Sequence, residues 1–218
     1  MFATLNASGY TYNKVFYHAE FEKILANVVT CYNQMLVDGV KLENNENKIR
    51  DVLLYRYLKC QKFKEKIGIT DYLFDPELPE DSGRIDIRVM PVNPFINDKA
   101  YYIIECKRIN AVNTGGTTGL NAQYISEGIN RFVSEKYSSY FKVNGMIGFV
   151  VEPMDLTENI KSINDLLSNN FPQLNTTMTL TQRELLCGFG YSYCSTHTCS
   201  KGDLTIYHLM LDFSNNIS

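Results

Sequence analysis

Tyr101-Tyr-Ile-Ile-Glu-Cys-Lys107 is an apolar run that ends in two ionisable residues. Its bulky and β-branched side chains predict a buried strand. Side chains alternate between the two faces of a strand, so Glu105 and Lys107 are expected on the same face. Burying such groups is costly unless partners satisfy them. A divalent metal ion held by the carboxylate, with the ammonium facing a phosphate or a water molecule, would meet that cost.

Two segments further upstream carry matching acidic residues. The sequence 83–89, Gly-Arg-Ile-Asp-Ile-Arg-Val, places Asp86 within a β-branched alternation that predicts a second strand. Residues 44–58 have the apolar spacing of an amphipathic helix, with Glu46 in the first turn. The order is therefore a helix with a glutamate, a strand with an aspartate, and a strand with Glu-x-Lys.

This order resembles the PD-(D/E)XK nuclease superfamily, which has the restriction-endonuclease-like fold, over roughly residues 43–151. The resemblance implies an α/β protein with a central mixed β-sheet flanked by helices, here with an N-terminal helical extension. It also implies Mg²⁺-dependent hydrolysis of phosphodiester bonds, with DNA as the expected substrate and Mn²⁺ as a possible substitute. The proline that usually precedes the aspartate is replaced by Ile85, which leaves Asp81 as a rival to Asp86.

The resemblance also assigns roles to individual residues. Asp86, Glu105, Glu46 and the main-chain carbonyl of Cys106 are the expected metal ligands, because Mg²⁺ prefers hard oxygen donors. Lys107 is expected to orient or deprotonate the attacking water or to stabilise developing charge.

Structural alternatives exist for each of these residues. Glu46 is also explained as a first-turn carboxylate favoured by the helix dipole, and Glu43 competes with it for the ligand role. Asp86 is also explained as a surface residue near a turn. Glu105 and Lys107 are also explained as an ion pair at an exposed strand end.

A helix predicted over 120–138 follows the Glu-x-Lys strand. Gln123, Glu127 and Arg131 would share one of its faces at four-residue spacing. By resemblance, Gln123 and Arg131 are expected to contact nucleic acid; for Arg131, a solvated face with an ion pair is the alternative. Basic residues near the proposed ligands are further candidates for phosphate contacts: Arg84, Arg88 and Arg108. The lysines at 62, 64 and 66 are expected to lie on a wet surface.

The remaining pattern predicts one domain of 218 residues: an N-terminal helical extension (1–40), a catalytic core (41–151) and a C-terminal helix with closing strands (152–218). Expected elements are helices at 14–38 and 157–167, the latter capped by Thr157, and strands at 84–90, 100–107, 145–151 and 204–213. A Pro-rich turn is expected at 75–83, a hairpin connection at 91–98, and a flexible Gly/Thr/Asn-rich loop at 110–119.

Composition limits the possible partners. A net charge of −3 counts against broad affinity for polyanions, though a local basic cleft remains compatible with a nuclease. The sequence lacks a long apolar segment and a signal-like start, so we expect a cytoplasmic protein with no membrane partner. The protein is expected to act as a homodimer or beside a partner subunit. A nucleic-acid-binding or scaffold protein that keeps the fold without cleaving is the alternative function.

The six cysteines are scattered and are expected to be reduced thiols. One group offers soft metal ligands, for which a zinc site is an alternative to free thiols in a loop or strand: Cys187, Cys194, His197 and Cys199.

Overall fold

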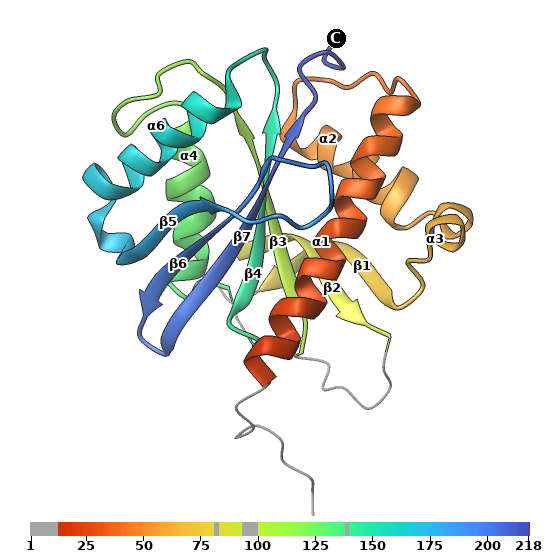
Figure 1. Cartoon of the computed structure of the whole chain (residues 1–218), viewed down its shortest axis with the longest axis horizontal. Coiled ribbons are helices and arrows are strands. Elements are labelled where there is room, and N and C mark those ends of the chain that lie inside the picture. Colours follow the sequence, from red (N-terminus) through yellow and green to blue (C-terminus); the bar gives the residue numbers. More distant parts are fainter. Residues whose placement is uncertain (1–12, 81–82, 93–99, 138–139) are drawn as a thin grey trace, which may run out of the picture.

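The fold is an α/β arrangement around one mixed seven-stranded sheet, seen in a computed structural model that describes residues 13–80, 83–92, 100–137 and 140–218 (Figure 1). The strand order is β1-β2-β3-β4-β7-β6-β5. The pairs β3–β4 and β4–β7 are parallel and the other pairs are antiparallel. The strands are β1 (Tyr72–Glu80), β2 (Gly83–Pro91), β3 (Tyr102–Ile109), β4 (Val143–Val150), β5 (Thr176–Gln182), β6 (Ser192–Cys199) and β7 (Gly202–Asp212).

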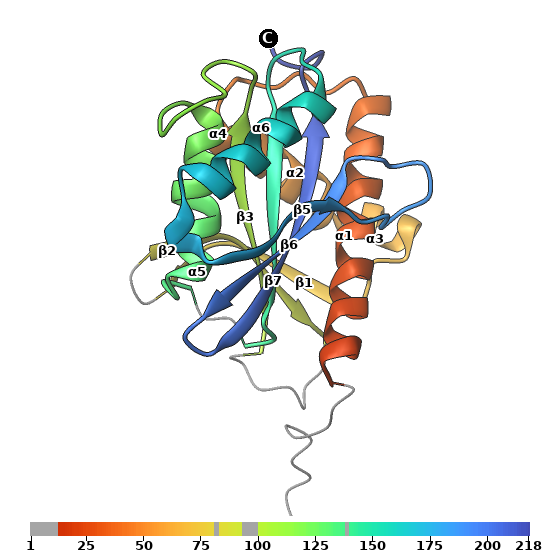
Figure 2. The same ribbon diagram turned by 60° about the vertical axis from the view of Figure 1, so that its left-hand side comes forward.

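Helices cover both faces of the sheet (Figure 2). One face carries α1 (Asn13–Val37), α2 (Glu46–Leu53), the π-helical η1 (Leu54–Leu58) and α3 (Gln61–Ile67). The other carries α4 (Leu120–Gln123), the π-helical η2 (Tyr124–Ile129), α5 (Asn130–Val133) and α6 (Leu156–Asn169), and the short 3-10 helix η3 (Pro172–Leu174) follows α6. The expected central mixed sheet with flanking helices and an N-terminal helix is confirmed.

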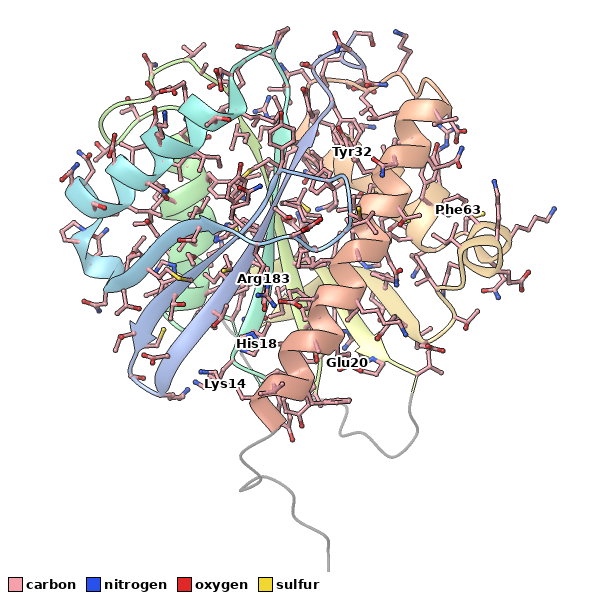
Figure 3. The ribbon with its side chains drawn as sticks, in the orientation of Figure 1. Lys14, His18, Glu20, Tyr32, Phe63 and Arg183 are labelled. Carbon is pink, nitrogen blue, oxygen red and sulfur yellow. The ribbon has the colours of Figure 1, made fainter. Side chains whose placement is uncertain are left out.

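Helix α1 is bound to the sheet by polar contacts as well as by its apolar face. His18 Nδ1 lies 3.0 Å from the hydroxyl of Tyr207 on β7, and that hydroxyl donates to Glu22 at 2.8 Å. Arg183 forms an ion pair with Glu22 at 2.8 Å and lies beside the helix near His18 (Figure 3). Further along α1, the Tyr32 hydroxyl donates to the Asp212 carbonyl at the end of β7.

Two apolar cores lie on the two faces of the sheet, and β3 contributes to both. Tyr102, Ile104 and Cys106 pack into the core beneath α1, whereas Ile103 and Ile109 pack into the core beneath η2 and α6. This alternation places Glu105 and Lys107 on the same face, as the sequence predicted, and that face is the η2 side.

Strand β2 pairs with β3 only as far as Ile87 and separates from it at Asp86. It pairs with β3 from Ile87 opposite Ile104 to Val89 opposite Tyr102, whereas β3 itself continues to Ile109. Ile87 packs into the core under α1, but Ile85, two residues away, packs into the opposite core. A regular strand would keep both on one face. Strand β2 stays in register with β1 on both sides of Asp86, so the β1–β2 pair twists away from the rest of the sheet there, where β2 parts from β3.

Several predicted elements need correction. The expected Pro-rich turn at 75–83 is largely strand β1, which pairs antiparallel with β2. Helix α6 is capped by Asp155, whose side chain accepts from two backbone N–H groups, and not by Thr157. The helix expected over 120–138 ends at Val133 and contains a π-helical turn. The closing strand expected at 204–213 is confirmed as β7, and it lies inside the sheet, between β4 and β6. The connection predicted at 91–98 falls mostly outside the described residues.

The cysteine–histidine group does not gather around a common point. All six cysteines are free, and Cys187 is exposed. His197 is buried on β6, with Nε2 2.9 Å from the Ser195 hydroxyl and Nδ1 3.2 Å from the Leu174 carbonyl. The same serine hydroxyl lies 2.9 Å from Nε2 of His208 on β7. The alternative of a zinc site is thus not supported in the described part of the chain.

This buried histidine chain predicts a loss of stability in acid. Burial lowers the pKa of His197 to about 4, and burial, with the neighbouring His197, lowers that of His208 well below its usual value. As the pH falls below about 6.5, these two histidines bind protons in the unfolded chain but stay neutral in the folded chain. The free energy of unfolding therefore decreases. We expect His197 to contribute a loss of about 2 kcal/mol between pH 6.5 and 5.

Urea unfolding of the wild type and of His197→Gln at both pH values measures this contribution. Groups remote from His197 titrate equally in both proteins and cancel in the comparison, and His208 keeps the burial that is the main cause of its lowered pKa. Equal pH dependence of the two proteins would contradict a neutral, buried His197.

None of the helices in the described part of the chain combines the length and apolar character needed to cross a bilayer.

Candidate functional site

Two carboxylates fill the gap that β2 leaves beside β3. The backbone N–H of Cys106 donates to Asp86 Oδ2 at 2.8 Å, and that of Arg108 donates to Glu46 Oε2 at 3.0 Å. Backbone N–H groups of a strand need acceptors, and here side chains take the place of a neighbouring strand's carbonyls. Glu46 is the first residue of helix α2, and the side chain of Asn45 caps that end of the helix. Both carboxylates keep one oxygen free of the backbone of β3.

The ammonium of Lys107 lies at the centre of the group. Its Nζ is 3.0 Å from each of three oxygens: Glu46 Oε1, Glu105 Oε1 and the Cys106 carbonyl. Burial disfavours the charge of Lys107, but the carboxylates of Glu105 and Glu46 outweigh burial and raise its pKa. Three of the four predicted metal ligands therefore surround a cation that the protein itself supplies.

Glu105 is fully buried and has three partners. Besides Lys107, the Arg131 Nη1 donates to Oε1 at 2.6 Å, and the Tyr137 hydroxyl lies 3.0 Å from Oε2. Burial and the nearby charge of Asp86 raise the pKa of Glu105 to about 7, although Lys107 and Arg131 act in the opposite direction. The two cations thus compensate the buried carboxylate only in part, and additional positive charge at this point would favour its ionised form.

Arg50 bonds the carboxylate of Asp86, and its role in the site was not predicted from the sequence. Its side chain is 2% exposed, and Nη1 donates to Asp86 Oδ1 at 2.9 Å. The same guanidinium bonds Asp51 at 2.8 Å. A usable signal did exist, because Arg50 follows Glu46 by four residues and so lies on the same helix face.

Tyr137 and Gly128 are further residues that the sequence analysis missed. The Tyr137 hydroxyl accepts from Arg131 at 2.7 Å and also lies 2.8 Å from the Arg84 carbonyl, which connects Glu105 to β2. A Cβ at Gly128 would collide with the end of the Met146 side chain and would lie 3.5 Å from Lys107 Cγ. Glycine therefore lets η2 pack directly over Lys107. No sequence pattern pointed to either residue.

The predicted nucleic-acid-binding residues divide into two groups. Arg131 points inward to Glu105, as an ion pair, with its side chain 33% exposed. Arg108 donates to the carbonyl and side chain of Asn44, at 3.0 and 2.8 Å. The side chains of Gln123 and Arg84 are exposed. The four-residue spacing assumed for this helix does not hold, because η2 is π-helical.

The structure also bears on the residues that the sequence offered as alternatives or as surface groups. Glu43, the rival of Glu46, is exposed, and Asp81, the rival of Asp86, lies outside the described residues. Arg88 forms an ion pair with Asp75 at 2.9 Å across the β1–β2 pairing. Lys64, expected on a wet surface, is buried and donates to the Tyr72 carbonyl.

The donor chemistry of the group suits a hard divalent cation. Asp86, Glu105, Glu46 and the Cys106 carbonyl offer only oxygen, which Mg²⁺ and Mn²⁺ prefer. Within the residues that the structure describes, no three His, Cys, Asp or Glu side chains are already placed around a common metal position. The carboxylates are bonded instead to Arg50, Lys107 and Arg131. A metal ion would therefore have to replace side-chain cations.

Comparison of the chain with protein-family models, with curated proteins and with solved structures finds no match.

Proposed function

We propose that this chain has a restriction-endonuclease-like core and hydrolyses phosphodiester bonds in DNA with the help of Mg²⁺. One observation carries the proposal: oxygen atoms from helix α2 and strand β3 converge on Lys107, and Asp86 of β2 bonds the same stretch of β3 at the point where β2 parts from it. Glu46, Glu105 and the Cys106 carbonyl each lie 3.0 Å from its ammonium. Asp86 is tied to the same stretch of β3 through the Cys106 N–H. A set of oxygen donors with one lysine among them is the equipment that metal-assisted phosphodiester hydrolysis needs.

The metal, when bound, would acidify the attacking water and neutralise charge on the phosphoryl oxygens. Asp86, Glu105 and the Cys106 carbonyl are the residues that would hold it, with Glu46 as a fourth donor. Lys107 remains next to these oxygens and can position a water molecule or stabilise negative charge by donating hydrogen bonds. Tyr137 keeps Glu105 oriented through Oε2, and Arg50 keeps Asp86 oriented through Oδ1.

Two features support contact with DNA through a small local surface. The net charge of −3 offers no general attraction to a polyanion. The exposed Arg84 and the half-buried Arg108 and Arg131 lie on the segments that carry the candidate ligands. We propose that these arginines contact the phosphates nearest the cleaved bond, and that a second copy or a partner subunit supplies the remaining binding surface.

The direct test is incubation with supercoiled plasmid DNA. We expect relaxed and linear products with Mg²⁺ or Mn²⁺ and none with EDTA. A parallel reaction with single-stranded RNA separates the two nucleic acids. Intact plasmid in both metals, with protein shown to be folded, would reject the proposed function.

Metal binding itself is tested at Glu105. We expect Glu105→Gln to abolish Mn²⁺ binding in calorimetric titration, because a neutral amide is a far poorer ligand than a carboxylate. The matched control is Glu22→Gln. Glu22 also accepts from an arginine and a tyrosine, Arg183 and Tyr207, but on the other face of the sheet. Wild-type affinity in the Glu105 variant would show that the metal binds elsewhere.

A second candidate function is a nucleic-acid-binding protein that does not cleave. The observation in its favour is that Arg50, Lys107 and Arg131 already occupy the carboxylates. A protein of this kind would retain the ion pairs for stability, would bind DNA, and would leave the plasmid intact in either metal. Retardation of a DNA duplex without any cleavage would favour it.

A further inference from the structure

Side-chain cations already hold the carboxylates of the site in the metal-free protein. Arg50 bonds Asp86 at 2.9 Å, Lys107 bonds Glu46 and Glu105 at 3.0 Å, and Arg131 bonds Glu105 at 2.6 Å. A divalent cation at the Glu105 carboxylate would lie against Lys107 and Arg131, and like charges repel strongly where little water screens them. One of the resident cations must therefore move away when a metal enters.

The exposures of the three cations identify which one moves. The Arg50 side chain is 2% exposed and that of Lys107 is 8% exposed, so neither reaches water without unpacking its surroundings. The Arg131 side chain is 33% exposed and comes from α5, the last turn of the continuous helix formed by α4, η2 and α5. Rotation about the bonds of the Arg131 side chain can bring its guanidinium into solvent, where the charge is well hydrated.

Arg131 also occupies the oxygen that a metal needs. Its Nη1 lies 2.6 Å from Glu105 Oε1. A Mg²⁺ ion bound to that oxygen would lie about 2.1 Å from it, so metal and guanidinium would come too close to coexist there. Tyr137, by contrast, lies 3.0 Å from the other oxygen, Oε2, and can remain in place.

We propose that Arg131 is the built-in competitor of the metal: it holds Glu105 in the metal-free protein, and a divalent cation takes its place. This inference rests on the proposed function, since it concerns metal entry to the same site. Arg131 is accordingly a positioning residue in the free protein. Its charge compensates part of the cost of burying the Glu105 carboxylate until the metal arrives.

The test is Mn²⁺ titration of the wild type, Arg131→Met and Arg88→Met. Methionine keeps an unbranched apolar chain but cannot compete for the carboxylate. Arg88 is the matched control, because it is also a partly exposed arginine that bonds one carboxylate and lies over a tyrosine ring, but its carboxylate is that of Asp75. We expect Arg131→Met to bind Mn²⁺ about tenfold more tightly, since one charged hydrogen bond no longer has to be broken. The Arg88 variant should change by no more than about twofold.

A thermal melt supplies a readout that does not depend on activity. Without metal, Arg131→Met should melt below the wild type, because Glu105 has lost a partner. Saturating Mn²⁺ should raise its Tm by more than it raises that of the wild type, because tighter binding to the folded state stabilises more. Equal or weaker Mn²⁺ binding in Arg131→Met, with the wild type binding normally, would overturn the inference and leave the proposed function standing. Absence of Mn²⁺ binding in both proteins would overturn both.

Discussion

Replacing Lys107 by alanine is expected to slow plasmid cleavage by about a hundredfold or more while Mn²⁺ binding is retained. The ammonium is positioned by Glu46, Glu105 and the Cys106 carbonyl, each 3.0 Å away. An ammonium group has only protons to donate and cannot be a metal ligand, so its loss removes no ligand. Its loss does remove a cation that competes for the same oxygens. We therefore expect Mn²⁺ affinity to be unchanged or tighter in this variant.

Lys64 provides the control for a change in a buried lysine. Taken as a whole residue, Lys64 is 8% exposed and Lys107 is 7% exposed, but Lys64 bonds the Tyr72 carbonyl on β1. Lys64→Ala should therefore reproduce the structural consequences of losing a buried ammonium without slowing cleavage comparably. Single-turnover cleavage rates and calorimetric titration decide the matter. Loss of Mn²⁺ binding in Lys107→Ala would contradict the assigned role, and so would an undiminished cleavage rate.

Arg50→Met is expected to cost about 3–5 kcal/mol of unfolding free energy, measured without metal by urea denaturation. The guanidinium is 2% exposed and bonds Asp86, whose side chain is 13% exposed. Removing one member of such a pair leaves the other charge poorly solvated, which costs more than the pair contributed. Asp86 would then retain the Cys106 N–H as a hydrogen-bond donor, but it would lose its ion pair with Arg50.

The double variant Arg50→Met with Asp86→Asn isolates the pair. If the destabilisation comes from the stranded carboxylate, neutralising Asp86 should recover a large part of it. Arg183→Met is the comparison for an exposed pair. The Arg183 side chain is 54% exposed and pairs with Glu22. We expect its replacement to lower the free energy of unfolding by less than about 1 kcal/mol. Similar losses in Arg50→Met and Arg183→Met would show that the Asp86 pair is not energetically special.

Short-range periodicity accounts for what the sequence predicted well. The shared face of Glu105 and Lys107 follows from strand alternation alone, and the structure confirms it. Helix α1 begins and ends within one residue of the expected 14–38, because its apolar spacing is long and Gly39 follows in the left-handed region. These features depend on residues within a few positions of each other.

The missed features depend on contacts between distant residues. The contact of Arg50 with Asp86 spans 36 residues, and that of Tyr137 with Glu105 spans 32, so no local pattern encodes them. Strand β1 was mistaken for a turn because of Pro76 and Pro79. Prolines are tolerated there because β1 lies at the edge of the sheet, where one side of the strand needs no donors. The π-helical turn in η2 breaks the four-residue spacing expected for this helix, and Arg131 forms an ion pair with the buried Glu105.

The position of β7 has a consequence for the order in which the protein can fold during synthesis. Although β7 is the last strand along the sequence, it separates β4 from β6 in the sheet. A chain on the ribosome therefore has β3 and β4 available well before their half of the sheet gains its neighbouring strand. Until then β4 presents an unpaired edge, and α1 lacks its contacts with Tyr207 and Asp212. Such distant pairings favour slow, late closure of the sheet, so the cluster on β3 should reach its final surroundings only after residue 212 has been added.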